Sequence, residues 1–238
     1  MQTDLPKIFC AIDTPDLNRA KDLGKILKGH VDGLKLGLEF FSSVGFDGLN
    51  EMTEIGLPLF IDLKLHDIPN TVYHTVKALC RFNPHMLTIH TQGGPAMLNA
   101  ANDASLEYSH EKGIQRPLLL GVTILTSLVD QDLKAVGVEN SISDQVQKLG
   151  RLALNCGFDG LVCSPHEVKA LRKNLSSMYL VVPGIRPEGS AVDDQKRVMT
   201  PKEAKDAGAD TLVIGRPITG AQDPAAAAQA IAQSLAEH

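Results

Sequence analysis

The sequence is poor in aromatic residues. It contains no tryptophan, and aromatic residues make up only 4% of its 238 residues. Proteins that bind single-stranded nucleic acid stack the bases on aromatic side chains, so this scarcity disfavours that class. The chain also lacks a run of basic residues, and its formal net charge is -5. We therefore expect no nucleic acid among its partners.

Long apolar runs and paired cysteines are absent too. No apolar run approaches the ~20 residues that a membrane span needs, and residues 1–4 lack the features of a signal peptide. The four cysteines, Cys10, Cys80, Cys156 and Cys163, form no C-x-x-C pair. We expect them to be buried free thiols. The predicted protein is cytoplasmic and does not bind a membrane.

Short apolar runs alternate with amphipathic stretches along the chain. The composition, with 43% hydrophobic and 21% charged residues, is ordinary for a globular protein. Eight apolar runs are candidate strands, at 7–13, 33–37, 58–65, 86–90, 117–125, 160–163, 179–185 and 211–218. Candidate helices lie between or after them, at 16–28, 71–81, 94–112, 144–156, 165–173, 201–207 and 224–236.

This alternation predicts a parallel sheet, because each helix returns the chain to the start of the next strand. Eight units in a chain of this length favour a single closed (β/α)8 TIM barrel over residues 1–238. A doubly wound open sheet is the main alternative. Two connections are long: we interpret 186–197 as a mobile lid, and 130–143 as the site of a short extra helix.

One segment, Asp-Leu-Lys-Leu-His-Asp-Ile-Pro-Asn-Thr at 62–71, ends the third candidate strand with charged residues. Alternation along a strand predicts that Asp62 and Lys64 share one face. Asp67 should follow in a loop, since Ile-Pro breaks the strand. Asn70 is expected to cap the helix that begins at residue 71. Packing gives no reason for three charges here, whereas catalysis does.

Polar residues end most of the other candidate strands. Because the active sites of (β/α)8 barrels lie at the carboxyl ends of the strands, these residues are expected to meet in one site. An ion-pair network on the rim would explain one or two of them, but not the whole set. The set comprises Asp13, Lys35, Asp62, Lys64, Asp67, His90, Thr126, Ser127, Arg186, Gly215 and Arg216.

The alternating charges of Lys35, Asp62, Lys64 and Asp67 indicate a type of chemistry. A lysine between carboxylates keeps its proton, because nearby negative charge favours the ammonium form. Such a lysine is a poor Schiff-base nucleophile, which requires the neutral amine. It is a good proton donor and a good stabiliser of a developing carbanion. The pattern therefore favours protonation of a carbanion over aldolase chemistry.

Other strand ends indicate a ligand with a phosphate group. Gly215 and Arg216 suit the phosphate site that barrels commonly form after strands seven and eight. Arg186 and Gln195 of the predicted lid could close over it. Thr126 and Ser127 could bind the amide edge of a pyrimidine, although a Thr-Ser pair at a strand end is more often a helix cap.

A metal site at His66, His90 and Asp62 is the less favoured interpretation. Lys35 and Lys64 would place two cations beside the ion. We therefore expect no metal.

The chain resembles the orotidine 5′-phosphate decarboxylase family over essentially its whole length. The pattern D-x-K-x-x-D-I-P-N-T at 62–71 is highly specific to this family. Further matching segments, in the family's order, lie at 11–13, 34–37, 122–127, 182–187 and 213–218. The chain looks like the free-standing bacterial type, since no phosphoribosyltransferase domain is attached.

The resemblance implies conversion of orotidine 5′-phosphate to UMP and carbon dioxide in pyrimidine biosynthesis, without a cofactor, by a homodimer with shared sites. It implies that Lys64 protonates C6 and that Asp62 lies against the substrate carboxylate. The resemblance also implies that Lys35 links these two residues to the ribose and that Asp13 binds ribose hydroxyls. Asp67 and Thr71 are implied to reach the neighbouring subunit's site. Thr126 and Ser127 are implied to contact the pyrimidine, and the phosphate is implied to be held by Arg186, Gln195, Gly215 and Arg216.

Two other functions stay open at this point. A related barrel decarboxylase acts on a keto-sugar phosphate with a divalent metal and shares D-x-K-x-x-D. By resemblance it carries an acidic metal ligand on the second strand, where this chain has Lys35. A non-catalytic nucleotide-binding barrel is the second alternative, and the complete charged set counts against it.

Overall fold

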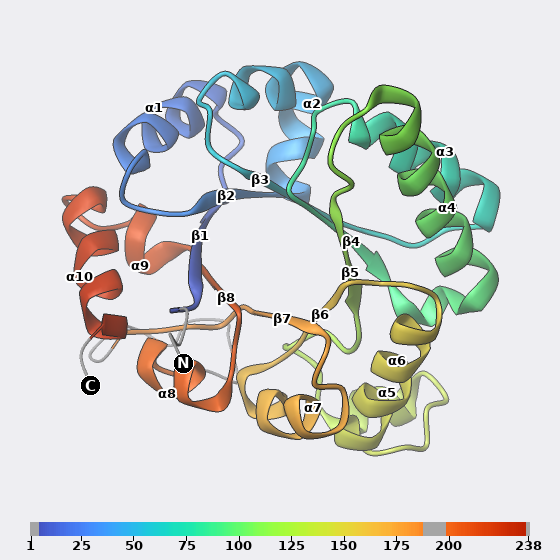
Figure 1. The fold of residues 1–238 in the computed structure, drawn as a ribbon. Coiled ribbons are helices and arrows are strands. Elements are labelled where there is room, and N and C mark those ends of the chain that lie inside the picture. The colour runs from blue at the N-terminus through green and yellow to red at the C-terminus, as the bar shows by residue number, and fades with distance from the viewer. Residues whose placement is uncertain (1–4, 188–198, 237–238) are drawn as a thin grey trace.

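A computed structural model of the protein describes residues 5–187 and 199–236. Eight strands form a closed barrel in chain order, each parallel to the next, and β1 pairs with β8 to close the ring (Figure 1). This closure excludes the open-sheet alternative. The strands are β1 (Lys7–Ile12), β2 (Gly33–Gly37), β3 (Leu59–Leu65), β4 (Met86–His90), β5 (Leu118–Val122), β6 (Gly160–Val162), β7 (Tyr179–Val182) and β8 (Thr211–Ile214).

Helices surround the barrel (Figure 1). The longer ones are α1 (Leu17–Leu27), α2 (Leu38–Thr53), α3 (Pro69–Cys80), α4 (Gly94–Lys112), α6 (Ile142–Asn155) and α10 (Pro224–Ala236). The shorter ones are α5 (Asp130–Ala135), α7 (Val168–Asn174), α8 (Pro201–Ala207) and α9 (Arg216–Thr219), with single 3-10 turns at η1 (Thr91–Gly93) and η2 (Pro165–Glu167). Helix α5 confirms the extra helix predicted in the long connection after the fifth strand.

Helix α2 is absent from the elements that the pattern predicts. Gly45 explains the omission: its φ of 58° and ψ of -150° are not helical, so the helix is kinked there. A kink rotates the two halves relative to each other and breaks the 3.6-residue repeat on which the prediction depends.

Several predicted boundaries were wrong. The strands expected at 117–125, 179–185 and 211–218 end earlier, and a short helix starts at Arg216 immediately after β8. Asn70 does not cap α3, because that helix begins at Pro69 and Asn70 is its second residue. Proline suits the first helical position, since its φ is already helical and its missing N–H would have no partner there.

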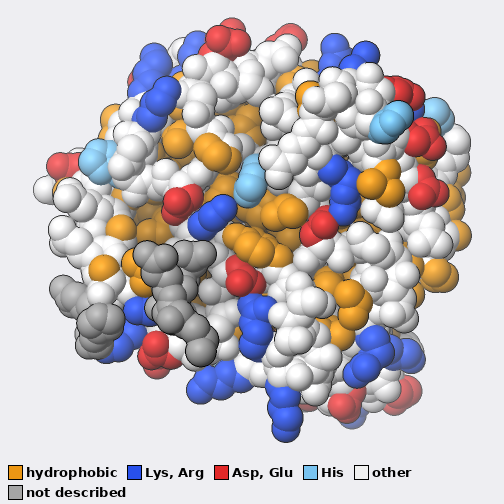
Figure 2. Space-filling model, in the orientation of Figure 1, with side chains coloured by type: hydrophobic (Ala, Val, Ile, Leu, Met, Phe, Trp, Pro, Cys, Tyr) orange, Lys and Arg blue, Asp and Glu red, His pale blue; other side chains and the backbone are white. Residues whose placement is uncertain are grey.

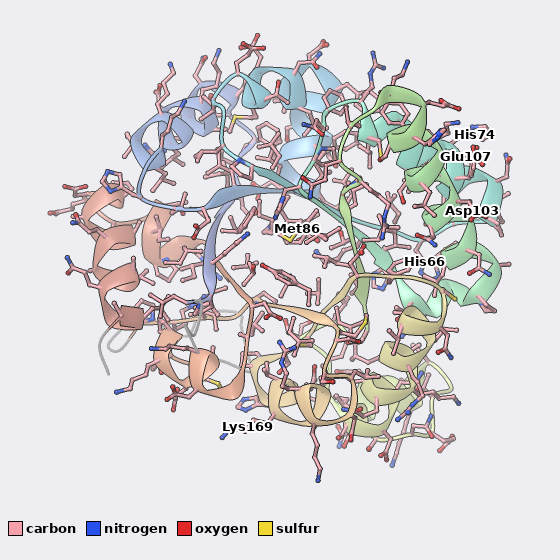
Figure 3. The ribbon with its side chains drawn as sticks, in the orientation of Figure 1. His66, His74, Met86, Asp103, Glu107 and Lys169 are labelled. Atoms are coloured by element: carbon pink, nitrogen blue, oxygen red, sulfur yellow. The ribbon has the colours of Figure 1, made fainter. Side chains whose placement is uncertain are left out.

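The barrel has two hydrophobic layers. Inside the ring lie Phe9, Ala11, Phe60, Met86, Leu120, Val181 and Val213, all buried, and Figure 3 labels Met86 within the circle of strands. The larger layer fills the space between the strands and the helices. Burial on both faces explains why the strands read as continuous apolar runs. All four cysteines are buried and free, as predicted.

Aspartates anchor the amino ends of three strands. Asp32, Asp159 and Asp210 accept hydrogen bonds from the backbone N–H groups of Ile8 (2.7 Å), Leu119 (2.8 Å) and Leu180 (2.6 Å).

The space-filling view in Figure 2 shows acidic and basic side chains interspersed around a hydrophobic centre. Among the described helices, none is both long enough and apolar enough to cross a bilayer.

Candidate active site

A cavity of about 280 Å³ opens where the strands end at their carboxyl side. Its floor is the inner hydrophobic layer, through Phe60, Val181 and Val213. Its polar wall is formed by eight of the predicted residues: Asp13, Lys35, Asp62, Lys64, Thr126, Arg186, Gly215 and Arg216. They come from β2 and β3 and from the segments that follow β1, β5, β7 and β8. The barrel therefore brings together residues that are more than 200 positions apart in sequence.

Two lysines and two aspartates form a chain of alternating charge along this wall. Lys64 Nζ donates to both carboxylate oxygens of Asp62, at 2.9 Å each. Lys35 Nζ lies 3.5 Å from Asp62 Oδ2 and 3.3 Å from Asp13 Oδ1. Gly37 leaves room for the outer pair, because a Cβ at that position would come within 3.1 Å of Lys35 Nζ. The side chains thus form the sequence Asp13–Lys35–Asp62–Lys64.

Asp62 is the buried centre of this network, with only 10% of its side chain exposed. Burial by itself raises the pKa of the Asp62 carboxyl. The charges of Lys35 and Lys64, together with hydrogen bonds from Lys64 and Thr88, outweigh burial and hold the pKa below its ordinary value. Asp62 is therefore an anion inside the site.

The backbone at Lys64 is not that of a regular strand. Its φ is 50°, a region that residues with a Cβ rarely adopt. The pairing of β3 with β4 passes from Ile61↔Leu87 directly to Leu65↔Ile89. Asp62 and Lys64 do face the same cavity, but an irregularity in the strand brings them there and not the simple alternation that the sequence predicts. Bulges and left-handed residues often occur at functional sites, where they direct a side chain.

Other predicted site residues do not line this cavity. Asp67 lies in the loop after β3, as predicted, where its carboxylate accepts a hydrogen bond from the Ile68 N–H. Asp67, Thr71 and Ser127 are exposed and are not part of the cavity wall. Gln195 and most of the predicted lid fall within 188–198, outside the described residues.

The two histidines of the less favoured metal site lie together beside the network. The ring centroids of His66 and His90 are 5.4 Å apart. Burial, and then the neighbouring His66 and Lys64, lower the pKa of His90, which favours the neutral imidazole. Within 5–187 and 199–236, no three His, Cys, Asp or Glu side chains are arranged to hold a metal ion.

Sequence reasoning missed two features of the site. Pro183 and Gly184, between β7 and Arg186, contribute to the wall. Thr88 is buried behind Asp62 and hydrogen-bonds to it. A signal for Thr88 was available, because it is the only polar residue within the otherwise apolar run 86–89.

A closed (β/α)8 barrel with a charged cavity at the carboxyl ends of its strands defines the class of barrel enzymes. Comparison with known sequences identifies the family within this class. The chain belongs to the orotidine 5′-phosphate decarboxylase / HUMPS family, whose model matches residues 6–231.

Individual relatives agree with this assignment. Proteins named orotidine 5′-phosphate decarboxylase from Rhodospirillum rubrum and Novosphingobium aromaticivorans are 49% and 48% identical to this chain. Each match covers 96% of this chain, and 93% and 98% of the respective relative. The crystal structure of orotidine 5′-phosphate decarboxylase from Lactobacillus acidophilus is 38% identical, with a TM-score of 0.84 over 98% of this chain and 100% of that chain.

Proposed function

We propose that this chain converts orotidine 5′-phosphate to UMP and carbon dioxide, the last step of de novo pyrimidine biosynthesis. The observation that carries the proposal is the Asp13–Lys35–Asp62–Lys64 network at the cavity wall. The names of the relatives support the substrate. The family description also includes a second group, HUMPS. Lys35 favours the decarboxylase, because a cation on β2 replaces the acidic metal ligand expected of the sugar-phosphate relative.

In the proposed reaction, the bond between C6 and the carboxylate carbon breaks, and its electron pair stays on C6. Carbon dioxide leaves, and the Lys64 ammonium gives C6 a proton to form UMP. No adjacent carbonyl can delocalise the electron pair of this vinyl carbanion, so a positive charge held beside C6 is the main source of stabilisation. Lys64 then regains its proton from solvent. We propose that the chain's own residues perform this chemistry without a metal or an organic cofactor.

Asp62 has a different proposed role, next to the substrate carboxylate. Two anions side by side repel, and loss of carbon dioxide relieves the repulsion. Binding energy from distant parts of the substrate would have to offset this repulsion on binding. Lys35 limits the cost, because its ammonium lies within 3.5 Å of both Asp62 and Asp13. We assign to Lys35 and Asp13 the binding of the ribose hydroxyls.

The far side of the cavity suits the phosphate and the pyrimidine. Arg186 and Arg216 both line it, and a guanidinium group can bind two phosphate oxygens at once. We propose that they hold the phosphate with the backbone at Gly215, and that Gln195 closes over it. Thr126 and Ser127 are proposed to bind the pyrimidine amide edge.

We further propose a homodimer with shared sites. Asp67 and Thr71 are exposed at the start of α3, and Ile68 between them is 65% exposed. These side chains are therefore accessible to a second subunit that packs against this end of the barrel. In the dimer, Asp67 and Thr71 would reach the partner's cavity.

The enzyme is proposed to act in the cytoplasm as a single domain, with no nucleic acid or membrane partner.

The decisive experiment is to add purified protein to orotidine 5′-phosphate in EDTA and to follow the ultraviolet absorbance. Rapid loss of the orotate chromophore, with UMP as product, is the expected result. If folded, dimeric protein leaves the absorbance unchanged, the proposal is wrong. Turnover of a keto-sugar phosphate after addition of magnesium would then identify the alternative activity. Tight binding of a pyrimidine nucleotide with no turnover of either substrate would identify a binding protein.

A further inference from the structure

Thr88, in the middle of β4, is buried behind the charged network with 1% of its surface exposed. Its Oγ1 lies 2.9 Å from the backbone nitrogen of Lys64 and 2.9 Å from Asp62 Oδ1. A backbone N–H can only donate, so the hydroxyl accepts from Lys64. Its own proton is then directed at the Asp62 carboxylate, which can only accept. One hydroxyl therefore connects the backbone of Lys64 to the side chain of Asp62.

The position of Thr88 in the sheet explains why such a bond is needed. The register of β3 and β4 leaves the three residues 62–64 opposite Thr88 alone. Regular ladder hydrogen bonds cannot form across such a mismatch. The Thr88 hydroxyl provides the hydrogen bond that the Lys64 N–H would otherwise lack. It holds a residue whose φ of 50° is unfavourable for any side chain with a Cβ.

We propose that Thr88 is a positioning residue for the decarboxylation, an inference that rests on the proposed function. The hydroxyl fixes the Lys64 backbone at one end, and Asp62, held by the same hydroxyl, fixes the Lys64 ammonium at the other. A long, flexible side chain anchored at both ends presents its proton at one place. Thr88 is not part of the cavity wall, so it acts through Asp62 and Lys64.

The test compares two substitutions that separate the effect of the hydroxyl from the effect of side-chain size. Thr88→Val keeps the shape of the side chain but removes the hydroxyl, whereas Thr88→Ser keeps the hydroxyl and removes a methyl group. We expect Thr88→Val to lower kcat by at least ~10-fold, because misplacing a reacting group by a fraction of an ångström is costly. KM should change less than ~3-fold, since the substrate contacts remain. Thr88→Ser should stay within ~3-fold of wild type in kcat, because the anchoring hydroxyl is present.

A second readout separates positioning from a general loss of packing. Removing the donor to Asp62 raises the pKa of that carboxyl, so the acid limb of the kcat profile moves to higher pH in Thr88→Val and not in Thr88→Ser. The same shift should appear in a carbon-13 NMR titration of aspartate-labelled protein, with the Asp62 signal assigned by its loss in Asp62→Asn. The NMR titration needs no turnover, so it tests Thr88 even if the wild-type protein fails to decarboxylate orotidine 5′-phosphate.

Three outcomes would overturn the inference. The first is a wild-type kcat in Thr88→Val. The second is an equal loss of kcat in Thr88→Val and Thr88→Ser. The third is an Asp62 pKa that is the same in Thr88→Val as in the wild type. If Thr88→Val does not fold, Thr88→Ala takes its place in the comparison with Thr88→Ser. Both of those side chains are smaller than threonine, and only serine retains the hydroxyl.

Discussion

The ammonium group of Lys64 is bound to Asp62 through both carboxylate oxygens, at 2.9 Å each. Because the carboxylate is buried and accepts through both oxygens, this lysine is held in one place before any ligand arrives. The site is therefore organised in advance around the ammonium group that is proposed to donate the proton. Catalysis that depends on such preorganised charge loses most of its rate when the charge is removed.

Lys64→Ala should lower turnover by at least ~10⁴-fold, since it removes both the proton donor and the charge that stabilises the carbanion. Absorbance measurements with orotidine 5′-phosphate give the rate. The substituted protein should still bind UMP in a phosphate-dependent manner, which isothermal titration calorimetry measures. Lys64→Arg is the matched control: it keeps the charge but is a poor proton donor, so it should also be severely impaired. Near-normal turnover in Lys64→Ala would contradict the mechanism.

The proposed shared site predicts complementation between two poorly active proteins. Lys64→Ala and Asp67→Ala are each expected to be poorly active. In a mixed dimer, one of the two sites combines an intact Lys64 from one subunit with an intact Asp67 from the other. Random exchange makes half of the dimers mixed, so activity should recover to about a quarter of wild type. Mass spectrometry verifies the exchange, and verified exchange without recovered activity would refute the shared site.

Cys10 is predicted to be unreactive in the folded protein. Burial, and then the nearby charge of Asp13, raise the pKa of the Cys10 thiol to about 12. At about pH 8 only on the order of one molecule in ten thousand would carry the reactive thiolate. Iodoacetamide followed by peptide mass spectrometry should leave Cys10 unmodified in native protein and modified in guanidinium chloride. Rapid alkylation of Cys10 in the native state would contradict this prediction.

Asp62 makes stability depend on pH in acid. Its pKa is lowered on folding from an ordinary value of 3.8, so the unfolded chain takes up the proton first as the pH falls. The stabilisation from the charged carboxylate is complete above that value and is lost as the pH falls towards the folded pKa.

Urea unfolding of wild type and Asp62→Asn measures this effect. The difference between their free energies of unfolding should be constant above about pH 5. Below about pH 4 the free energy of unfolding of the wild type should fall relative to that of Asp62→Asn. A difference that stays constant down to about pH 3 would contradict the ion-pair network as the cause.

The sequence predicts the barrel well because its strands are buried on both faces and separated by amphipathic helices. The same pattern predicts that Asp13, Lys35 and Asp62 meet, since strand ends converge in any closed parallel barrel. Helix α2 was not predicted, because the non-helical backbone conformation of Gly45 interrupts the helical repeat. Asn70 was misjudged as a cap because Pro69 starts the helix earlier.

The finer geometry of the site depends on contacts that a pattern does not record. The left-handed backbone at Lys64 follows from a mismatch between two strands, and no property of lysine itself favours it. Thr88 hydrogen-bonds to a residue 26 positions away. A polar residue in an apolar run marks this position in the sequence, but its partners follow only from the register of β3 against β4.

The pairing of β1 with β8 has a consequence for the order of assembly during synthesis. Phe9 pairs with Val213, and Asp13 stands in the same cavity wall as Arg216. A growing chain therefore leaves one edge of its first strand unpaired until the eighth strand has left the ribosome. Contacts between segments so distant in sequence form late and slowly. A nascent chain that ends before residue 211 therefore holds Lys35 and Lys64 but lacks Arg216, one of the two arginines proposed to hold the phosphate.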